Sequence, residues 1–121
     1  MNRLLILNLY YAPESFGGAT IVAEETSRRL QDHHDWAVLV VTTMRDHSLP
    51  AFFLKRYKAN GVNVVAINLP FDFHGEDSFR NPAVAKSVLE IARAFKPDVC
   101  HCHAIQIIGC GFFEDFIDDG I

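Results

Sequence analysis

Two histidines and two cysteines alternate near the end of the chain, and both residue types are common in catalysis and in metal binding. They are Cys100, His101, Cys102 and His103. Successive side chains of a strand point to opposite faces, so the imidazoles share one face and the thiols share the other. Zinc would need ligands from both faces, and no second C-x-x-C motif or spaced histidine pair exists. The pattern therefore predicts no metal site and favours small, reduced, buried cysteines.

His103 is the histidine best placed for chemistry, because it ends the predicted strand. In open α/β sheets, ligands bind in the crevice beyond the carboxyl ends of the strands. An imidazole there can donate a hydrogen bond to a sugar hydroxyl or accept one from it. His103 is therefore the candidate catalytic residue. The alternative is a histidine whose ring nitrogens are satisfied by nearby backbone.

A glycine pair precedes the first predicted helix, in a loop that should face the same crevice. Gly17 and Gly18 would let the backbone approach a ligand, and a helix N-terminus offers N–H groups to a phosphate or sugar hydroxyl. The alternative is a loop that needs positive φ. The pair does not form G-x-G-x-x-G, so dinucleotide binding has little support. Tyr11 and Glu14, in the same loop, are further candidate substrate contacts.

Composition and motifs exclude several classes of protein. The net charge is −4, without a basic stretch, which disfavours a nucleic-acid binder. No apolar run approaches the roughly 18 residues of a membrane span, and the short N-terminal run lacks a cleavage site, so we expect a cytoplasmic protein. There is no Walker A loop, no G-x-S-x-G elbow and no carboxylate pair at a defined spacing, although Glu14 and Asp72 are acids in candidate crevice loops.

Apolar runs predict the strands that would position these residues. Four short runs suit strands buried on both faces. They cover residues 4–9, 36–42, 62–69 and 98–103. Residues 43–60 are expected to be irregular, with a short helical piece near 53–58, and residues 70–80 are expected to form a loop.

Helical periodicity predicts three helices between and after the strands. The first carries an apolar stripe with i, i+3, i+4 spacing. That stripe consists of Ala19, Val22, Ala23, Thr26 and Leu30. On its exposed face we expect the ion pairs Glu24–Arg28 and Glu25–Arg29. The second helix starts at Asn81-Pro82 and stops at Lys96-Pro97, and the third covers residues 105–119.

Strands alternating with helices predict an α/β fold, a Rossmann-like parallel sheet of order 3-2-1-4 flanked by helices. In that order the loops at residues 10–18 and 104–106 are neighbours. The length of 121 residues fits one domain. A further strand would be expected where the chain stops, so we expect an incomplete domain. The fourth strand would then be an exposed edge, which predicts a homodimer through it or through the last helix.

Two segments carry a resemblance to a known family. Residues 5–19, LILNLYYAPESFGGA, resemble the opening strand and Gly-Gly loop of the family-4 retaining glycosyltransferases. Residues 96–103, KPDVCHCH, resemble the same family's Pro-Asp strand that ends in His-x-His. Three departures stand out: Thr20 occupies a position that is often acidic, residues 32–36 replace a Gly-His, and cysteines replace branched aliphatics in the last strand.

The resemblance implies a GT-B fold, with this chain as its N-terminal, mainly acceptor-binding half. The C-terminal half, which would hold the nucleotide-sugar donor, is absent from this chain. By position, Gly17 and Gly18 would approach donor phosphates or acceptor, and His103 would contact the transferred sugar. Such enzymes retain configuration without a metal or other cofactor. We expect no turnover from the isolated chain; the rival hypothesis is a stand-alone flavodoxin-like or regulatory module that binds a small ligand or a protein.

Overall fold

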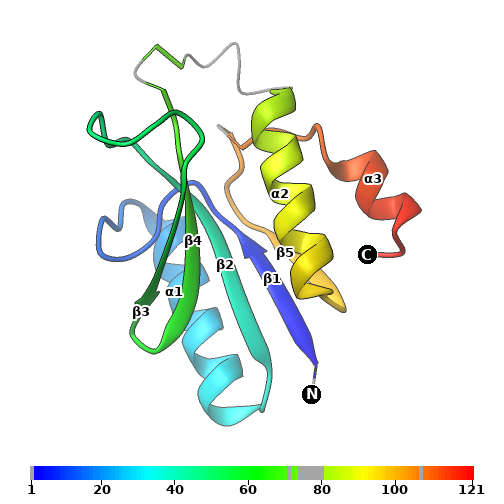
Figure 1. Ribbon diagram of the computed structural model, residues 1–121. Helices are drawn as coiled ribbons and strands as arrows, with labels where there is room; N and C mark the ends of the chain where they lie inside the picture. Colours follow the sequence, from blue (N-terminus) through cyan, green and yellow to red (C-terminus); the bar gives the residue numbers. More distant parts are fainter. Residues whose placement is uncertain (1, 71, 74–80, 107) are drawn as a thin grey trace.

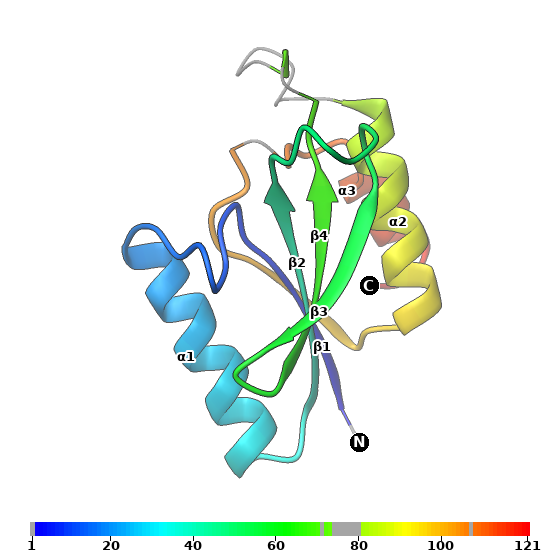
Figure 2. The same ribbon diagram turned by 60° about the vertical axis from the view of Figure 1, so that its left-hand side comes forward.

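A computed structural model describes residues 2–70, 72–73, 81–106 and 108–121. The elements, in chain order, are β1 (Arg3–Leu7), α1 (Gly18–His33), β2 (Ala37–Met44), β3 (Leu54–Ala59), β4 (Val62–Asn68), α2 (Pro82–Phe95), β5 (Val99–Cys102) and α3 (Phe113–Asp118). One sheet forms the middle layer, with α1 on one face and α2 and α3 on the other (Figures 1 and 2). Most of the predicted loop at 70–80 lies outside the described residues. Across the described ranges, every helix falls short of the length and apolarity that a bilayer crossing demands.

The sheet has the strand order β3-β4-β2-β1-β5. Strands β4, β2, β1 and β5 are parallel, and β3 pairs with β4 in the antiparallel direction. The four parallel strands correspond to the four apolar runs of the sequence. Their predicted order, 3-2-1-4, and the Rossmann-like α/β fold are therefore confirmed.

The edge strand β3 replaces the helical piece predicted near residues 53–58, and that prediction is wrong. The reason is the turn that follows. Asn60 and Gly61 have φ values of 52° and 81°, so both residues of a two-residue loop lie in the left-handed region. Such turns match the twist of an antiparallel hairpin. Ala59 and Val62 pair directly across the loop, and β3 continues away from it.

Gly61→Ala is expected to lower the free energy of unfolding by about 1–2 kcal/mol, because an L-residue is strained in the left-handed region. A Cβ at Gly61 would meet no atom within 4 Å, so the loss comes from the backbone alone. Gly18→Ala is the matched control, since a Cβ there also meets nothing and its φ lies outside that region. Urea unfolding followed by circular dichroism measures both. Equal losses in the two variants would contradict the turn assignment.

Two apolar clusters hold the layers together, one on each face of the sheet. On the α2 face, residues of β1, β2 and β4 pack against α2 and α3. Almost fully buried members of that cluster include Leu5, Leu7, Val41, Ile67, Val84, Val88, Ile108 and Phe112. On the α1 face, the alternate residues of the same strands pack against α1 and the loop before it. They include Leu4, Ile6, Val38, Val40 and Val64. Every central strand is thus buried on both faces, which explains its continuous apolar run.

Helix α1 forms as predicted, but its buried face matches the predicted stripe only in part, at Ala23 and the partly buried Leu30. Thr20, Ala23 and Ser27 are buried, whereas Val22 is 55% exposed. The hydroxyls can be buried because each donates a hydrogen bond to a carbonyl four residues earlier. The Thr20 bond, to Phe16 O, is 2.7 Å long, and that of Ser27, to Ala23 O, is 2.6 Å. A satisfied hydroxyl carries little burial penalty, so small polar residues replace aliphatic ones against the sheet.

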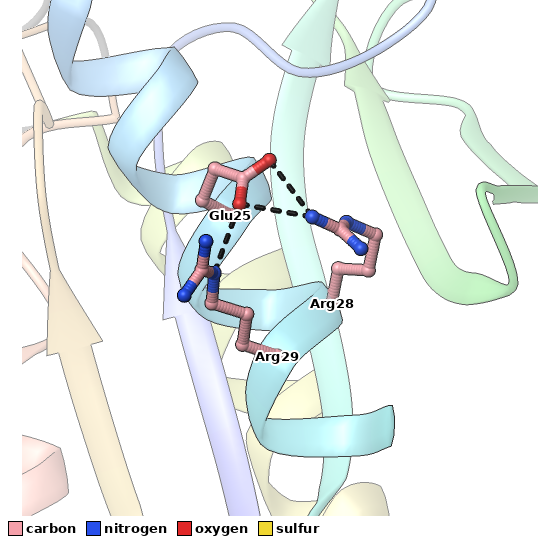
Figure 3. Close-up of polar contacts among 3 residues, drawn as sticks. All are labelled: Glu25, Arg28 and Arg29. Carbon is pink, nitrogen blue, oxygen red and sulfur yellow. Dashed lines mark hydrogen bonds and ion pairs between the residues drawn. The ribbon is translucent and has the colours of Figure 1, made fainter. Parts of the chain in front are cut away.

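The exposed side of α1 carries an ion-pair cluster centred on Glu25 (Figure 3). Its carboxylate lies 2.9 Å from Arg28 Nη2 and 3.1 Å from Arg29 Nε. The predicted Glu25–Arg29 pair is confirmed. The predicted Glu24–Arg28 pair is wrong, because Glu24 accepts a hydrogen bond from the Ser15 hydroxyl instead. Exposed pairs of this kind contribute little to stability.

The last helix is shorter than predicted, because α3 begins at Phe113 rather than near residue 105. Gly109 has a φ of 79°, and this left-handed residue interrupts the helical path. The predicted apolar stripe nevertheless contains residues that are buried against α2, notably Phe112 and Phe116. Behind α3, Asp119 accepts from Arg93 Nε of α2 at 2.8 Å. This ion pair links the end of α3 to α2 at the surface.

Candidate functional site

The loops that follow β1 and β5 run side by side at the carboxyl edge of the sheet. Leu7 of β1 lies beside Cys102 of β5 in the parallel register. Beyond the strands, His103 N donates to Leu7 O at 3.0 Å and Leu9 N donates to Ala104 O at 2.7 Å. The pairing thus continues past the ends of both strands. The sequence predicts that these two loops are neighbours, and this is confirmed.

A single buried amide, that of Asn8, joins three segments at this edge. Asn8 directly follows β1 and is 1% exposed. Its Nδ2 donates to Tyr10 O at 2.6 Å and to Thr20 Oγ1 at 3.0 Å, and its Oδ1 accepts from Ala104 N at 3.0 Å. Asn8 therefore holds the loop after β1, the first turns of α1 and the loop after β5 in fixed positions.

Sequence reasoning missed Asn8 as a residue that builds this edge. The available signal was an amide inside an otherwise apolar run, at the carboxyl end of a predicted strand. A buried amide must find partners for both its donors and its acceptor, so it marks a place where loops converge. Thr20, which departs from the family pattern, is one of those partners and is itself buried.

The two glycines before α1 differ in backbone conformation. Gly17 has φ 85° and ψ 163°, a region open essentially only to glycine. Gly18 has no such φ, and a Cβ on either glycine would meet no atom within 4 Å. Gly17 is therefore required by the backbone, whereas neither conformation nor packing requires a glycine at position 18. The space in front of both is open, which leaves room for a ligand.

The His103 ring is partly buried and stacked on that of His101, with centroids 4.0 Å apart and planes inclined at 33°. Among the described residues, its buried Nε2 has no hydrogen-bond partner. Burial, and secondarily the nearby His101, lower the pKa of His103 below its ordinary value. The ring is therefore neutral at neutral pH, and its Nε2 can exchange a hydrogen bond with a hydroxyl.

Of the two remaining candidate substrate contacts, one lies at the surface and the other lies in the core. Glu14 is exposed in the loop before α1. Tyr11 is only 4% exposed and packs in the cluster beneath α1, where burial raises the pKa of its phenol. The fold thus brings Gly17, Gly18 and His103 to the same edge of the sheet and places Tyr11 beneath it.

Two exposed aromatic rings stand in the glycine loop, and sequence reasoning did not single them out. Tyr10 is 39% exposed and Phe16 is 73% exposed. Their rings meet edge to face with centroids 5.6 Å apart. Exposed aromatic faces at this edge can pack against the apolar C–H face of a sugar ring.

The thiols lie on the opposite face of β5 from the imidazoles, as the alternation predicts. Cys100 and Cys102 pack against the apolar cluster of the α2 face. Throughout the described ranges, no group of three or more His, Cys, Asp or Glu side chains is arranged to hold a metal ion.

Comparison with known proteins gives one family. The family described as Glycosyltransferase Family 4 matches residues 16–113, which include the glycine pair, every strand after β1 and the histidine that follows β5. No curated protein and no solved structure matches the chain.

Proposed function

The chain belongs to glycosyltransferase family 4, and from that premise we propose that it is the acceptor-side domain of a retaining transferase with a GT-B fold. Such an enzyme moves a sugar from a nucleotide-sugar donor to an acceptor. The carboxyl edge of the sheet supports the proposal, because Asn8 ties the glycine loop to the segment that carries His103. Ligands of open α/β sheets bind at this edge.

Each residue of the crevice has a role in the proposal. The neutral His103 exchanges a hydrogen bond through Nε2 with a hydroxyl of the transferred sugar. The open backbone at Gly17 and Gly18 approaches the donor phosphates or the acceptor. The exposed rings of Tyr10 and Phe16 line the acceptor side. Tyr11 has a packing role.

A second, donor-binding domain completes the reaction in this proposal. It holds the nucleotide and supports the leaving diphosphate, which helps to deprotonate the acceptor on the face from which it departs. This chain alone is therefore expected to bind saccharides without turnover. Release of nucleoside diphosphate from UDP- or GDP-sugars by the isolated chain would contradict the assignment of donor binding to a second domain.

Gly18→Ala tests the crevice directly. The variant is expected to keep its stability within about 0.5 kcal/mol, because the added methyl meets no protein atom. Saccharide binding is expected to fall by roughly tenfold, since the methyl occupies the space of the ligand and displaces a hydrogen-bonded contact. Saturation-transfer NMR with a panel of mono- and disaccharides measures binding, and urea unfolding measures stability.

Gly17→Ala is the matched comparison, because it strains the backbone as well. It is expected to lose both stability and binding. If Gly18→Ala binds every saccharide that the wild type binds with unchanged affinity, no ligand approaches this loop and the proposed role of the glycine pair is wrong.

A further inference from the structure

A hollow of about 470 Å³ lies on the α2 face of the sheet, far from the crevice just described. Its walls are formed by Leu39 of β2, the first half of β4, the middle of β3 and the end of α2. On the sheet side they include Leu39, Asn63 and Val65; on the helix side they include Ile91, Ala94 and Phe95. These strand positions lie near the amino-terminal ends of β2 and β4. The hollow is therefore at the opposite end of the sheet from His103 and the glycine pair.

The hollow exists because α2 does not reach the edge strand. The buried residues of α2 pack on β1, β2 and β4. No helix of the described residues covers the neighbouring face of β3, and Figure 2 shows α2 set to one side of this strand. The floor is apolar, with Val65 and Ile91 almost fully buried and the half-buried Phe95 beside them. This size is typical of small-molecule sites, which are mostly apolar with a few polar groups.

Two cations stand on the β3 side of this apolar floor. Arg56 and Lys58 alternate with Tyr57 along β3, and Arg56 pairs with the floor residue Val65 across the sheet. Both cations line the hollow, and none of the described residues in its lining is an aspartate or glutamate. Within the described part of the chain, neither cation has an ion pair. In a protein of net charge −4, this is a local positive patch beside apolar surface.

We propose that this hollow binds an amphiphilic anion, namely a single alkyl chain that ends in a phosphate or carboxylate. The alkyl chain packs on the half-buried Phe95 and the exposed Ala94, and the head group pairs with Arg56 and Lys58. Apolar burial supplies affinity in proportion to chain length, and the charge-assisted hydrogen bonds select an anion. The inference goes beyond sugar transfer and does not depend on it, because it uses none of the residues of the crevice.

Alkyl phosphates below their micelle concentration provide the probe. Isothermal titration with hexyl, octyl and decyl phosphate is expected to show affinity rising two- to fourfold per added methylene, up to the length that fills the hollow. Arg56→Ala and Lys58→Ala are each expected to weaken octyl phosphate binding by about tenfold. Lys55→Ala is the matched control, since Lys55 lies on the same strand but points to the other face, and it should bind like the wild type.

A further variant separates binding in the hollow from general attraction to positive charge. Ala94 is exposed on the last turn of α2, so Ala94→Trp is expected to fold normally, fill the hollow and abolish binding. Three outcomes would overturn the proposal: octanol binding as tightly as octyl phosphate, Lys55→Ala losing as much affinity as Arg56→Ala, or binding to anionic phosphatidylglycerol vesicles without binding to monomeric octyl phosphate. None of these probes contains a sugar, so their failure leaves the transferase proposal unaffected.

Discussion

Asn8→Ala is expected to lower the free energy of unfolding by about 2–4 kcal/mol, because several buried polar groups lose their partners at once. The Ala104 N–H and the Tyr10 carbonyl are both left without the amide. The loops after β1 and β5 also lose their common anchor, so saccharide binding should fall with stability. Urea unfolding and saturation-transfer NMR measure the two effects.

Asn63→Ala is the control for this substitution, because Asn63 is also an asparagine on a strand but is exposed. It is expected to change stability by less than about 0.5 kcal/mol. If Asn8→Ala is as harmless as Asn63→Ala, the carboxyl edge does not depend on the buried amide.

Asn8→Asp tests whether the donor or the acceptor of the amide contributes more to stability. The acid keeps an acceptor for Ala104 N but loses the donors to Tyr10 O and Thr20 Oγ1. Burial next to a carbonyl should raise the folded-state pKa of the new carboxyl above its unfolded value of about 3.9. The folded state then binds the proton more tightly, so the penalty of Asn8→Asp relative to wild type should shrink as the pH falls from 7 towards 4. A penalty that does not change with pH would contradict this assignment of donors.

Removal of the His103 imidazole is expected to weaken saccharide binding by roughly tenfold or more, because Nε2 is the buried polar atom that the crevice offers to a hydroxyl. His103→Ala should leave the fold intact, since among the described contacts this segment is held through its backbone N–H to Leu7 O. His101→Ala is the control, because it removes an exposed imidazole from the same face of the strand. Equal affinity of wild type and His103→Ala for the saccharides would show that His103 is not part of the binding site.

The pH dependence of stability gives a second readout on the same ring. Because the pKa of His103 is lowered in the folded state, the unfolded chain takes up the proton first as the pH falls. This contribution to stability is therefore fully present above pH 6.5, and is lost as the pH falls through the window between the unfolded and folded pKa values. His103→Gln should flatten that slope. In an NMR titration, His101→Ala should raise the pKa of His103, and titration of His103 at or above its ordinary pKa in the wild type would contradict the burial argument.

The parallel core of the fold was predictable because each central strand is buried on both faces and reads as an unbroken apolar run. The edge strand was not, because β3 is covered less and carries Lys55, Arg56 and Lys58 where a buried strand would carry aliphatics. Its real signal is the Asn60-Gly61 pair that follows, which dictates a hairpin whatever the composition of the strand.

The location of the candidate site could be predicted from the sequence, but the contacts that form it could not. Topology alone brings the ends of neighbouring parallel strands together, so the positions of Gly17 and His103 follow from the strand order. Whether a loop residue faces the crevice or the core depends on packing that no local pattern reveals. Tyr11 turns under α1 because small residues such as Ala23 leave room there. The role of Asn8 was missed because a single polar residue at the end of a strand does not reveal which groups it bonds. Its role is clear only when its three hydrogen-bond partners are known.

The hairpin has one consequence for how copies of this chain can associate. It moves one open edge of the sheet from β4 to β3, whose three cations repel an identical strand laid against it. Like charges therefore disfavour backbone pairing of two copies through their β3 edges.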